Sequence, residues 1–329
     1  MRVGTPVSLE ALTASIREDL EGVEHEIRRM LAVEQAPVRD LMEHIGRFSG
    51  KRLRPALTLL AGRMFGELTP AHRTVGAIVE IIHMATLVHD DILDESRMRR
   101  RVETVNERVG NETAVLLGDY LFATAFKEAA ALEDRFPSRY LAEVVGVVCR
   151  GEILQIHHRH DFELSEATYF RIIEDKTAAL YAAALRCGAY LSGAPEEQRE
   201  ALARFGMKMG SAFQVVDDIL DLVGDEDRVG KSLGTDLEKE KMTLPLLRLL
   251  RRLPQTGRER LRREITEGEA EHVRETLLPL LQEHGAIDSA RETARELVQA
   301  AFAELTIVPD TPERTLLRQS AEYVLARDR

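Results

Sequence analysis

The feature that most constrains this sequence is a pentapeptide that occurs twice. Asp-Asp-Ile-Leu-Asp runs from Asp90 to Asp94 and again from Asp217 to Asp221, each time at the end of a long apolar segment. In a helix the first and last carboxylates of each copy lie on one face, about one turn apart. Carboxylates gathered on buried helices are costly unless positive charge neutralises them, and Mg2+ with phosphate oxygens does this well. The repeat predicts two acidic clusters that face each other across a cavity and bind a diphosphate through Mg2+.

The rest of the chain has the pattern of an all-α protein. Apolar residues recur at three- to four-residue steps, most of the 11 prolines fall at predicted helix boundaries, and no alternating strand pattern of useful length occurs. Thr69 and Pro70 are expected to open a central buried helix, and Ser138 to start a later one. Residues 97–101 lack an apolar period and are expected to form a loop. We expect one domain over residues 1–329, with 250–329 as a peripheral helical part.

Composition and charge exclude some classes of protein. The net charge of −11 argues against a general nucleic-acid binder. The first residues lack a signal-peptide pattern, and no uncharged apolar stretch is long enough to span a membrane. The two cysteines, Cys149 and Cys187, lie in apolar helical contexts and are expected to be reduced, buried thiols in a cytoplasmic protein.

Basic residues stand beside the acidic motifs rather than on polar helix faces, and this favours a role in binding anions. Taken singly, each is more often a surface charge, and a single acidic cluster could be a solvated helix end. Two identical clusters, each followed by a basic loop, favour a functional site. The basic residues are Lys51, Arg54, Arg99, Arg100, Lys176, Lys231 and Lys241.

Five blocks of sequence resemble the trans-polyprenyl diphosphate synthase family over most of residues 40–250. Together they are specific, although no single block would be. They are residues 50–55 (Gly-Lys-Arg-Leu-Arg-Pro); residues 80–83 and 89–96 with Arg99 and Arg100; Gly151, Glu152 and Gln155; residues 176–178; and residues 210–221 with Lys231, 234–237 and 241–245.

The resemblance implies a bundle of long, mostly antiparallel helices around a deep central cavity. It also implies a homodimer that condenses isopentenyl diphosphate with an allylic diphosphate after Mg2+-dependent ionisation of the allylic substrate. Asp90, Asp94 and Asp217 would hold about three Mg2+ ions, supported by Asp91, Asp218 and Asp221. The remaining implied site residues are Arg99, Lys176, Thr177, Gln214, Lys231 and Lys241 for the allylic diphosphate, and Lys51, Arg54, His83 and Arg100 for isopentenyl diphosphate. Of these residues, Asp90, Asp94, Asp217, Lys176 and Arg99 would be catalytic.

The chain departs from the family pattern in three loops. Arg101 and Glu103 stand where Gly and Pro are usual, Ser49 replaces a common Gly, and Glu240 replaces a common Gly before Lys241. These departures affect the expected loop geometry and rate more than the reaction itself.

Product length is expected to depend on the helix that precedes Asp90. Ala85 lies five residues before that aspartate, about 7.5 Å deeper in a helix, with Thr86 beside it. By resemblance, a small residue here goes with longer products, so we expect a chain of about 30 to 50 carbons. Ile82 or Ile78, with Phe122 or Phe126, would form the floor of the cavity. Alternatively, Ala85 only packs between helices.

Other readings remain open. A geranylgeranyl or farnesyl diphosphate synthase would make a shorter product, and a catalytically silent subunit should have lost one acidic motif. A terpene cyclase would not need the isopentenyl diphosphate site, and a di-iron bundle would need a second Glu-x-x-His pair. His157, His158 and His160 look like a metal cluster, but a solvated helix end is the favoured interpretation.

Overall fold

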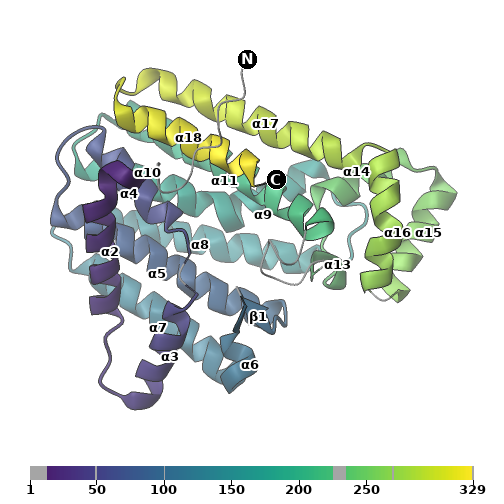
Figure 1. Ribbon diagram of the computed structural model, residues 1–329, viewed down its shortest axis with the longest axis horizontal. Coiled ribbons are helices and arrows are strands. Elements are labelled where there is room, and N and C mark those ends of the chain that lie inside the picture. Colours follow the sequence, from purple (N-terminus) through teal and green to yellow (C-terminus); the bar gives the residue numbers. More distant parts are fainter. Residues whose placement is uncertain (1–12, 49, 100, 225–234, 269, 328–329) are drawn as a thin grey trace.

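The computed structural model describes residues 13–48, 50–99, 101–224, 235–268 and 270–327. Its elements, labelled as in Figure 1, are almost all helical. The helices are η1 Ala14–Ile16, α2 Arg17–Met30, α3 Ala36–Gly46, α4 Leu53–Arg63, α5 Pro70–Leu93, α6 Val105–Val109, α7 Asn111–Ala130, α8 Arg135–His157, α9 Glu166–Ile173, η2 Glu174–Ala178, α10 Ala179–Leu191, α11 Glu196–Val223, α13 Thr235–Glu238, α14 Leu244–Arg252, α15 Gln255–Glu267, α16 Ala270–Glu283, α17 Ala286–Glu304, η3 Leu305–Ile307 and α18 Pro312–Ala326.

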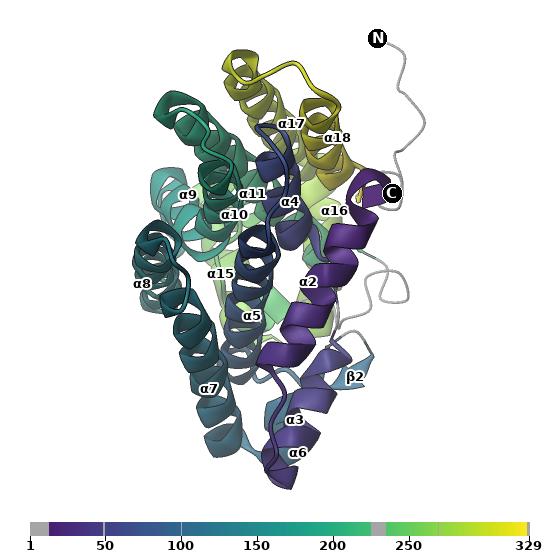
Figure 2. The same cartoon turned by 90° about the vertical axis from the view of Figure 1, so that its left-hand side faces the viewer.

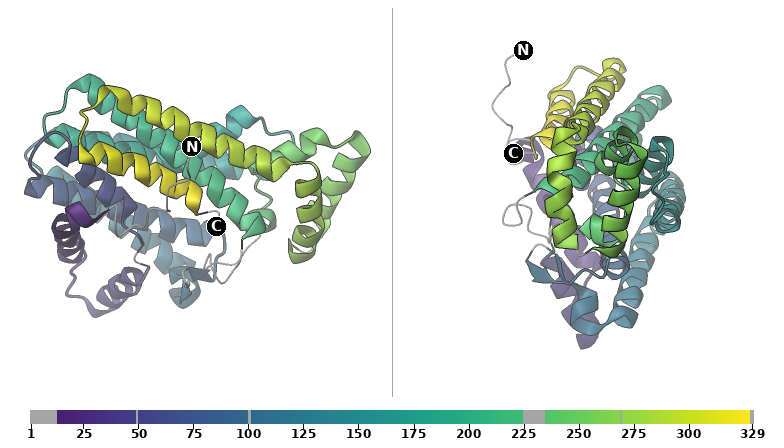
Figure 3. Two further views of the ribbon diagram at one scale, coloured as in Figure 1. Left: turned by 45° about the horizontal axis from the view of Figure 1, so that its top comes forward. Right: turned by 90° about the vertical axis from the view of Figure 1, so that its right-hand side faces the viewer.

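The longest helices run roughly side by side and form a bundle (Figures 1 and 3). Viewed from the side in Figure 2, α4, α5, α10 and α11 occupy the middle, with α7 and α8 on one flank and α2 and α17 on others. α10 packs against both α4 and α11, and α17 lies along α11. One continuous hydrophobic cluster extends from Ile16 to Val324. The all-α prediction is confirmed. In the described part of the chain, no helix is both long and apolar enough to cross a membrane.

Helix α5 shows how the sequence builds the central layer. Thr69 caps it, with its backbone N–H donated to His72 Nδ1 at 3.0 Å, and Pro70 is its first residue, as predicted. From Val75 to Ile82 every residue is buried, so this helix is enclosed by protein on all sides. It ends at Leu93, and therefore delivers the first acidic motif at its C-terminus.

Close helix packing also depends on Gly188 in α10. A Cβ atom at this position would lie 2.0 Å from the carbonyl oxygen of Thr58 in α4. Glycine is therefore required for α10 to approach α4 as closely as it does. α10 also packs against α11, which carries the second acidic motif.

Three sequence predictions about local structure were wrong. Cys149 is exposed rather than buried, although Cys187 is buried as expected. Residues 97–101 are not simply a loop, because β1 (Met98–Arg99) and β2 (Val102–Glu103) pair as a short antiparallel hairpin. Helix α8 begins at Arg135 rather than Ser138, because the Asp134 carboxylate accepts a hydrogen bond from Phe136 N at 2.7 Å and caps the helix earlier.

Candidate active site

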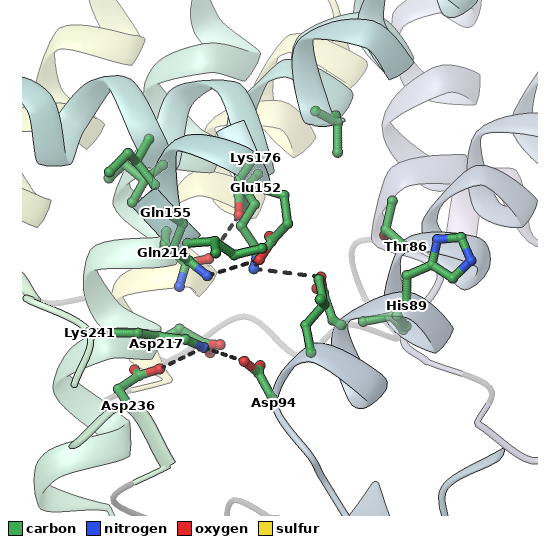
Figure 4. A pocket seen from close by; sticks show the side chains of 18 of the residues that line it. Thr86, His89, Asp94, Glu152, Gln155, Lys176, Gln214, Asp217, Asp236 and Lys241 are labelled. Atoms are coloured by element: carbon green, nitrogen blue, oxygen red, sulfur yellow. Dashed lines mark hydrogen bonds and ion pairs between the residues drawn. The ribbon is translucent and has the colours of Figure 1, made fainter. Parts of the chain in front are cut away.

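A cavity of about 730 Å³ lies between the two acidic motifs (Figure 4). Its wall includes α5, α8, η2 and α11, together with the segment before α14. Most residues predicted for the site line it. They are Arg54, His83, Thr86, Asp90, Asp94, Arg99, Lys176, Thr177, Gln214, Asp217, Asp218 and Lys241.

The other predicted residues lie elsewhere. Asp91, Asp221, Ile82 and Ala85 are buried and do not line the cavity, and the expected floor residue Ile78 is likewise buried in the core. Lys51 is exposed outside the cavity, where its ammonium contacts the Tyr323 hydroxyl. Arg100 and Lys231 lie outside the described residues.

Lysines hold the two cavity-lining carboxylates of the first motif. Lys176 Nζ lies 3.6 Å from Asp90 Oδ1, and Lys241 Nζ lies 2.8 Å from Asp94 Oδ1 (Figure 4). Burial alone would raise the pKa of Asp94, but the charges of Lys241 and Lys176 outweigh it, so that pKa lies below the usual value. Asp94 is therefore a carboxylate in the neutral pH range, as a ligand for a cation must be.

Asp91 has a different environment from its neighbours. Its side chain is 2 % exposed and accepts hydrogen bonds from Arg99, with Nη2 at 2.7 Å from Oδ1. Arg99 in turn lines the cavity. The position predicted to support a metal thus holds an arginine of the cavity wall in place.

The second motif divides in the same way. Asp217 lines the cavity and lies 2.8 Å from Arg327 Nη2, whereas Asp221 is fully buried and accepts the Asp236 backbone N–H at 3.0 Å. Asp218 lines the cavity but accepts hydrogen bonds from the Tyr169 hydroxyl at 2.5 Å and from Gln214 Nε2 at 2.8 Å. Within each motif, some carboxylates face the cavity and others support the wall.

Lys176 lies in a helix of unusual form. Residues Glu174–Ala178 make one turn of π-helix, a form often found at functional sites. Gly151 lets α8 approach this turn, because a Cβ atom there would lie 2.5 Å from Lys176 N. Burial lowers the pKa of Lys176, but the charges of Asp90 and Glu152 outweigh that effect and raise it. The lysine is therefore a permanent cation pointing into the cavity.

The side chains fit Mg2+ better than a softer metal. The ligands on offer are carboxylate oxygens from two helices, and Mg2+ binds through a few carboxylates completed by water and phosphate oxygens. In the described residues, no three His, Cys, Asp or Glu side chains form a ready-made metal cage. The histidines His157, His158 and His160 therefore do not form such a metal cage either. A cation bound here would take some of its ligands from the protein and the others from water and a phosphorylated substrate.

Sequence reasoning missed Arg327 and Tyr169. Arg327 follows the last helix, contacts Asp217 and stacks over the Phe213 ring at 4.1 Å. Tyr169 is buried on α9 and holds Asp218. Neither stands beside an acidic motif in the sequence, so only the fold reveals their roles.

The deeper wall of the cavity is apolar. Val148, Leu180 and Ile172 line it, as does Phe122, whose ring stacks with Phe126 at 6.4 Å between centroids. Phe122 is the one expected floor residue that reaches the cavity. An anionic, cation-lined mouth above an apolar interior suits a ligand with a charged head and a hydrocarbon tail.

The buried Asp218 should make stability depend on pH. Burial, with the nearby charge of Asp236, raises the pKa of Asp218 from 3.8 to about 8. Between these values the folded state binds more protons than the unfolded state. The free energy of unfolding should therefore fall with rising pH, by at most about 1.4 kcal/mol per pH unit from this group.

Thermal unfolding of the parent and of Asp218→Asn, from pH 5 to 9 without added metal, measures this effect. We expect the variant to gain stability relative to the parent as the pH rises. Parallel curves over the whole range would show that Asp218 titrates near its ordinary pKa.

Comparisons with known proteins agree with this geometry. The polyprenyl synthetase family model matches residues 35–278. The octaprenyl diphosphate synthase of Escherichia coli K12 is 36% identical, over 98% of this chain and 100% of that protein. The crystal structure of a decaprenyl diphosphate synthase from Rhodobacter capsulatus has a TM-score of 0.90 at 36% identity, covering 98% of this chain and 100% of the other. A polyprenyl synthase from Caulobacter crescentus CB15, complexed with calcium and isoprenyl diphosphate, has a TM-score of 0.92 at 34% identity, covering 99% of both chains. The predicted family is confirmed: this chain belongs to the polyprenyl synthetase family and is a prenyltransferase.

Proposed function

We propose that this enzyme joins isopentenyl diphosphate head-to-tail to an allylic diphosphate and releases an all-trans polyprenyl diphosphate of about 30 to 50 carbons. The observation that carries the proposal is the cavity itself, which has both acidic motifs and three cations at its mouth and an apolar interior. Relatives named octaprenyl and decaprenyl diphosphate synthase support the product range. The small side chains of Ala85 and Thr86 are consistent with it.

The allylic diphosphate would bind between the two motifs. Lys176, Lys241 and Arg99 are cations on this part of the wall, and Gln214 and Thr177 are joined by a hydrogen bond of 2.9 Å beside them. When the allylic carbon–oxygen bond breaks, the electron pair leaves with the diphosphate, and these fixed cations stabilise the charge that develops there. Bound Mg2+, about three ions, would supply further charge stabilisation to the same oxygens.

Isopentenyl diphosphate would bind beside Arg54 and His83. Both line the cavity, and the Arg54 guanidinium stacks over the Tyr181 ring at 4.3 Å, with its buried Nε lacking a hydrogen-bond partner. An unsatisfied buried donor of this kind suits a phosphate oxygen. Lys51 and Arg100 would complete the site.

The geometry would bring the two hydrocarbon ends together. The isopentenyl double bond attacks the allylic cation, a new carbon–carbon bond forms, and a proton is lost to restore a double bond. The departed diphosphate can accept that proton, so no dedicated protein base is required. Holding both substrates in one cavity converts a bimolecular encounter into an effectively unimolecular step.

We also propose that residues 1–329 form one polyprenyl synthetase domain, with 250–329 as its peripheral helical part. The continuous hydrophobic cluster from Ile16 to Val324 supports a single unit. The free cysteines Cys149 and Cys187 suit a cytoplasmic location, where thiols stay reduced.

Exposed apolar residues on α7 and α8 support a homodimer. These helices pack together and present side chains that are unusually exposed for their type: Val115, Leu116, Tyr120, Ile153 and Ile156. Ile153 and Ile156 also belong to the cavity wall, so a second copy placed here would cover that wall from outside.

We expect Leu116→Arg combined with Ile153→Arg to convert a dimer into monomers, because the side chains are 63% and 66% exposed in the single chain. Sedimentation velocity measures the change. Ile307→Arg is the matched control, since Ile307 is also exposed but lies on η3. A dimer that survives the double substitution would place the interface elsewhere.

Incubation of the purified protein with Mg2+, labelled isopentenyl diphosphate and a series of allylic starters tests the function, with product length read by chromatography. We expect a long all-trans product. A product that stops at 15 or 20 carbons, roughly half of that expected from the open cavity, would favour a farnesyl or geranylgeranyl diphosphate synthase. No incorporation with any starter would favour a silent subunit, although both acidic motifs are present.

A further inference from the structure

The turn that follows α8 contacts the first acidic motif and the loop that follows the second one. Its histidines suggest a solvated helix end in the sequence, but Arg159 between them points inward and is 22% exposed. Arg159 Nη2 donates a hydrogen bond to the Leu93 carbonyl at 3.2 Å and lies 3.8 Å from Asp94 Oδ1. A cation placed on the last carbonyls of a helix stabilises that end. Arg159 therefore holds the C-terminus of α5 where the first motif ends.

The next residue, His160, contacts the loop that carries Lys241. His160 N donates to the Glu240 carbonyl at 3.2 Å, and His160 Nδ1 hydrogen-bonds to the Glu240 carboxylate. Both residues have a left-handed backbone conformation, with φ of 63° for His160 and 48° for Glu240. Non-glycine residues adopt this conformation at a cost and keep it only where surrounding contacts impose it. Here each residue is held by the other.

These contacts continue through the loop back to the first acidic motif. From Glu240 the chain passes to Lys241, whose ammonium reaches Asp94 at 2.8 Å. Lys241 N donates to the Asp236 carbonyl at 2.8 Å, and Asp236 N donates to Asp221 at 3.0 Å. The turn after α8 thus connects the first motif, through Arg159, with the loop after the second motif, through His160.

We propose that Arg159 and the His160–Glu240 pair are positioning residues that hold the two acidic motifs at the separation needed to bind metal and allylic diphosphate together. The proposal rests on the proposed function. It adds that residues far apart in sequence and outside both motifs set the affinity of the site. Partners that orient metal-binding side chains typically change metal affinity or activity by about 10- to 100-fold when removed.

Substitutions at Arg159 test the first half. We expect Arg159→Gln to raise the half-saturating concentration of Mg2+ and the KM of the allylic diphosphate by about tenfold, with a much smaller change in kcat at saturation. Arg159→Lys, which keeps a charge near Asp94, should recover part of the loss. Arg139→Gln is the matched control, because Arg139 is an exposed arginine on α8, the helix that precedes the turn with Arg159.

A double-substitution cycle tests the second half. We expect His160→Ala and Glu240→Ala each to weaken Mg2+ and allylic diphosphate binding, and the double variant to be no worse than either single one, because both break one link. His157→Asn, in the exposed residue at the end of α8, is the control. Additive effects of the two substitutions would overturn the pair as a unit.

Amide hydrogen exchange on the protein without substrate or metal gives a readout independent of activity. The amides of Asp236 and Lys241 should exchange faster in His160→Ala and Glu240→Ala than in the parent and in His157→Asn. If an alanine variant loses its fold, as shown by thermal unfolding, Glu240→Gln and His160→Asn replace the alanine variants. Asparagine at position 160 tolerates the left-handed backbone there. Unchanged exchange and unchanged Mg2+ dependence in folded variants would overturn the proposal. A parent that never incorporates isopentenyl diphosphate would refute the proposed function, while exchange would still report on the link between the turn and the loop.

Discussion

Asp217→Asn should lower the rate of isopentenyl diphosphate incorporation by about 10²–10³-fold at unchanged stability. Asp217 lines the cavity with its side chain 29% exposed. Among the described residues its carboxylate pairs with Arg327, a cation that a diphosphate could also bind. Neutralising this carboxylate would remove a proposed ligand for the Mg2+ that would assist ionisation, without removing a buried contact. Steady-state assays at several Mg2+ concentrations, with thermal unfolding, measure both quantities.

Asp91→Asn is the informative comparison, because it removes the same charge from the same type of motif. Asp91 is buried and pairs with Arg99, so its loss leaves that guanidinium without its counter-charge. We expect a loss of stability of about 1–3 kcal/mol, together with reduced activity through a misplaced Arg99. Equal losses of activity at equal, unchanged stability would mean that all these aspartates act alike, and would contradict the division of each motif into cavity-facing and wall-supporting carboxylates.

The sequence could predict which segments form the candidate site, because the repeated acidic pentapeptide and the spacing of its carboxylates can be read from the sequence alone. Both acidic motifs, the apolar α5 and most of the cations occupy the expected wall. It could not rank the aspartates within a motif, because a helix alone does not reveal which side faces the cavity. Asp91 and Asp218 look equivalent to their neighbours in sequence, yet one anchors Arg99 and the other is held by Tyr169.

The structure explains two of the positions at which this chain departs from the family pattern. Arg101 and Glu240 stand where glycine is usual, and their φ values are 65° and 48°. Glycine adopts such angles without steric cost, so its usual presence there is explained by the backbone. This chain adopts these angles with other residues, and at Glu240 the contacts with His160 hold the backbone in place. Ser49 lies outside the described residues. The contact between His160 and Glu240 joins residues 80 positions apart, and such a contact leaves no periodic pattern in the sequence.

Thr86→Phe should change the product from a long polyprenyl diphosphate to a short one. Thr86 lines the cavity one helical turn before Asp90, about 6 Å along the helix axis. A phenyl ring there would project into the space through which the tail must grow, so only the first few carbons would fit between the diphosphate and the ring. Chromatography of the products measures the shift, and Thr86→Ser, which adds no bulk, is the control.

The same substitution at Ala85 distinguishes a gate from a packing position. Ala85 is 0% exposed and does not line the cavity, so a bulky residue must first displace neighbouring side chains, at a cost of about 1–3 kcal/mol. Ala85→Phe is also expected to shorten the product, but by pushing α5 or its neighbours into the cavity and with a lower unfolding temperature. Thr86→Phe should shorten it without that loss of stability. If Thr86→Phe left the length unchanged while Ala85→Phe shortened it, the tail would run along the face of α5 that carries Ala85, and the cavity described here would not be its path.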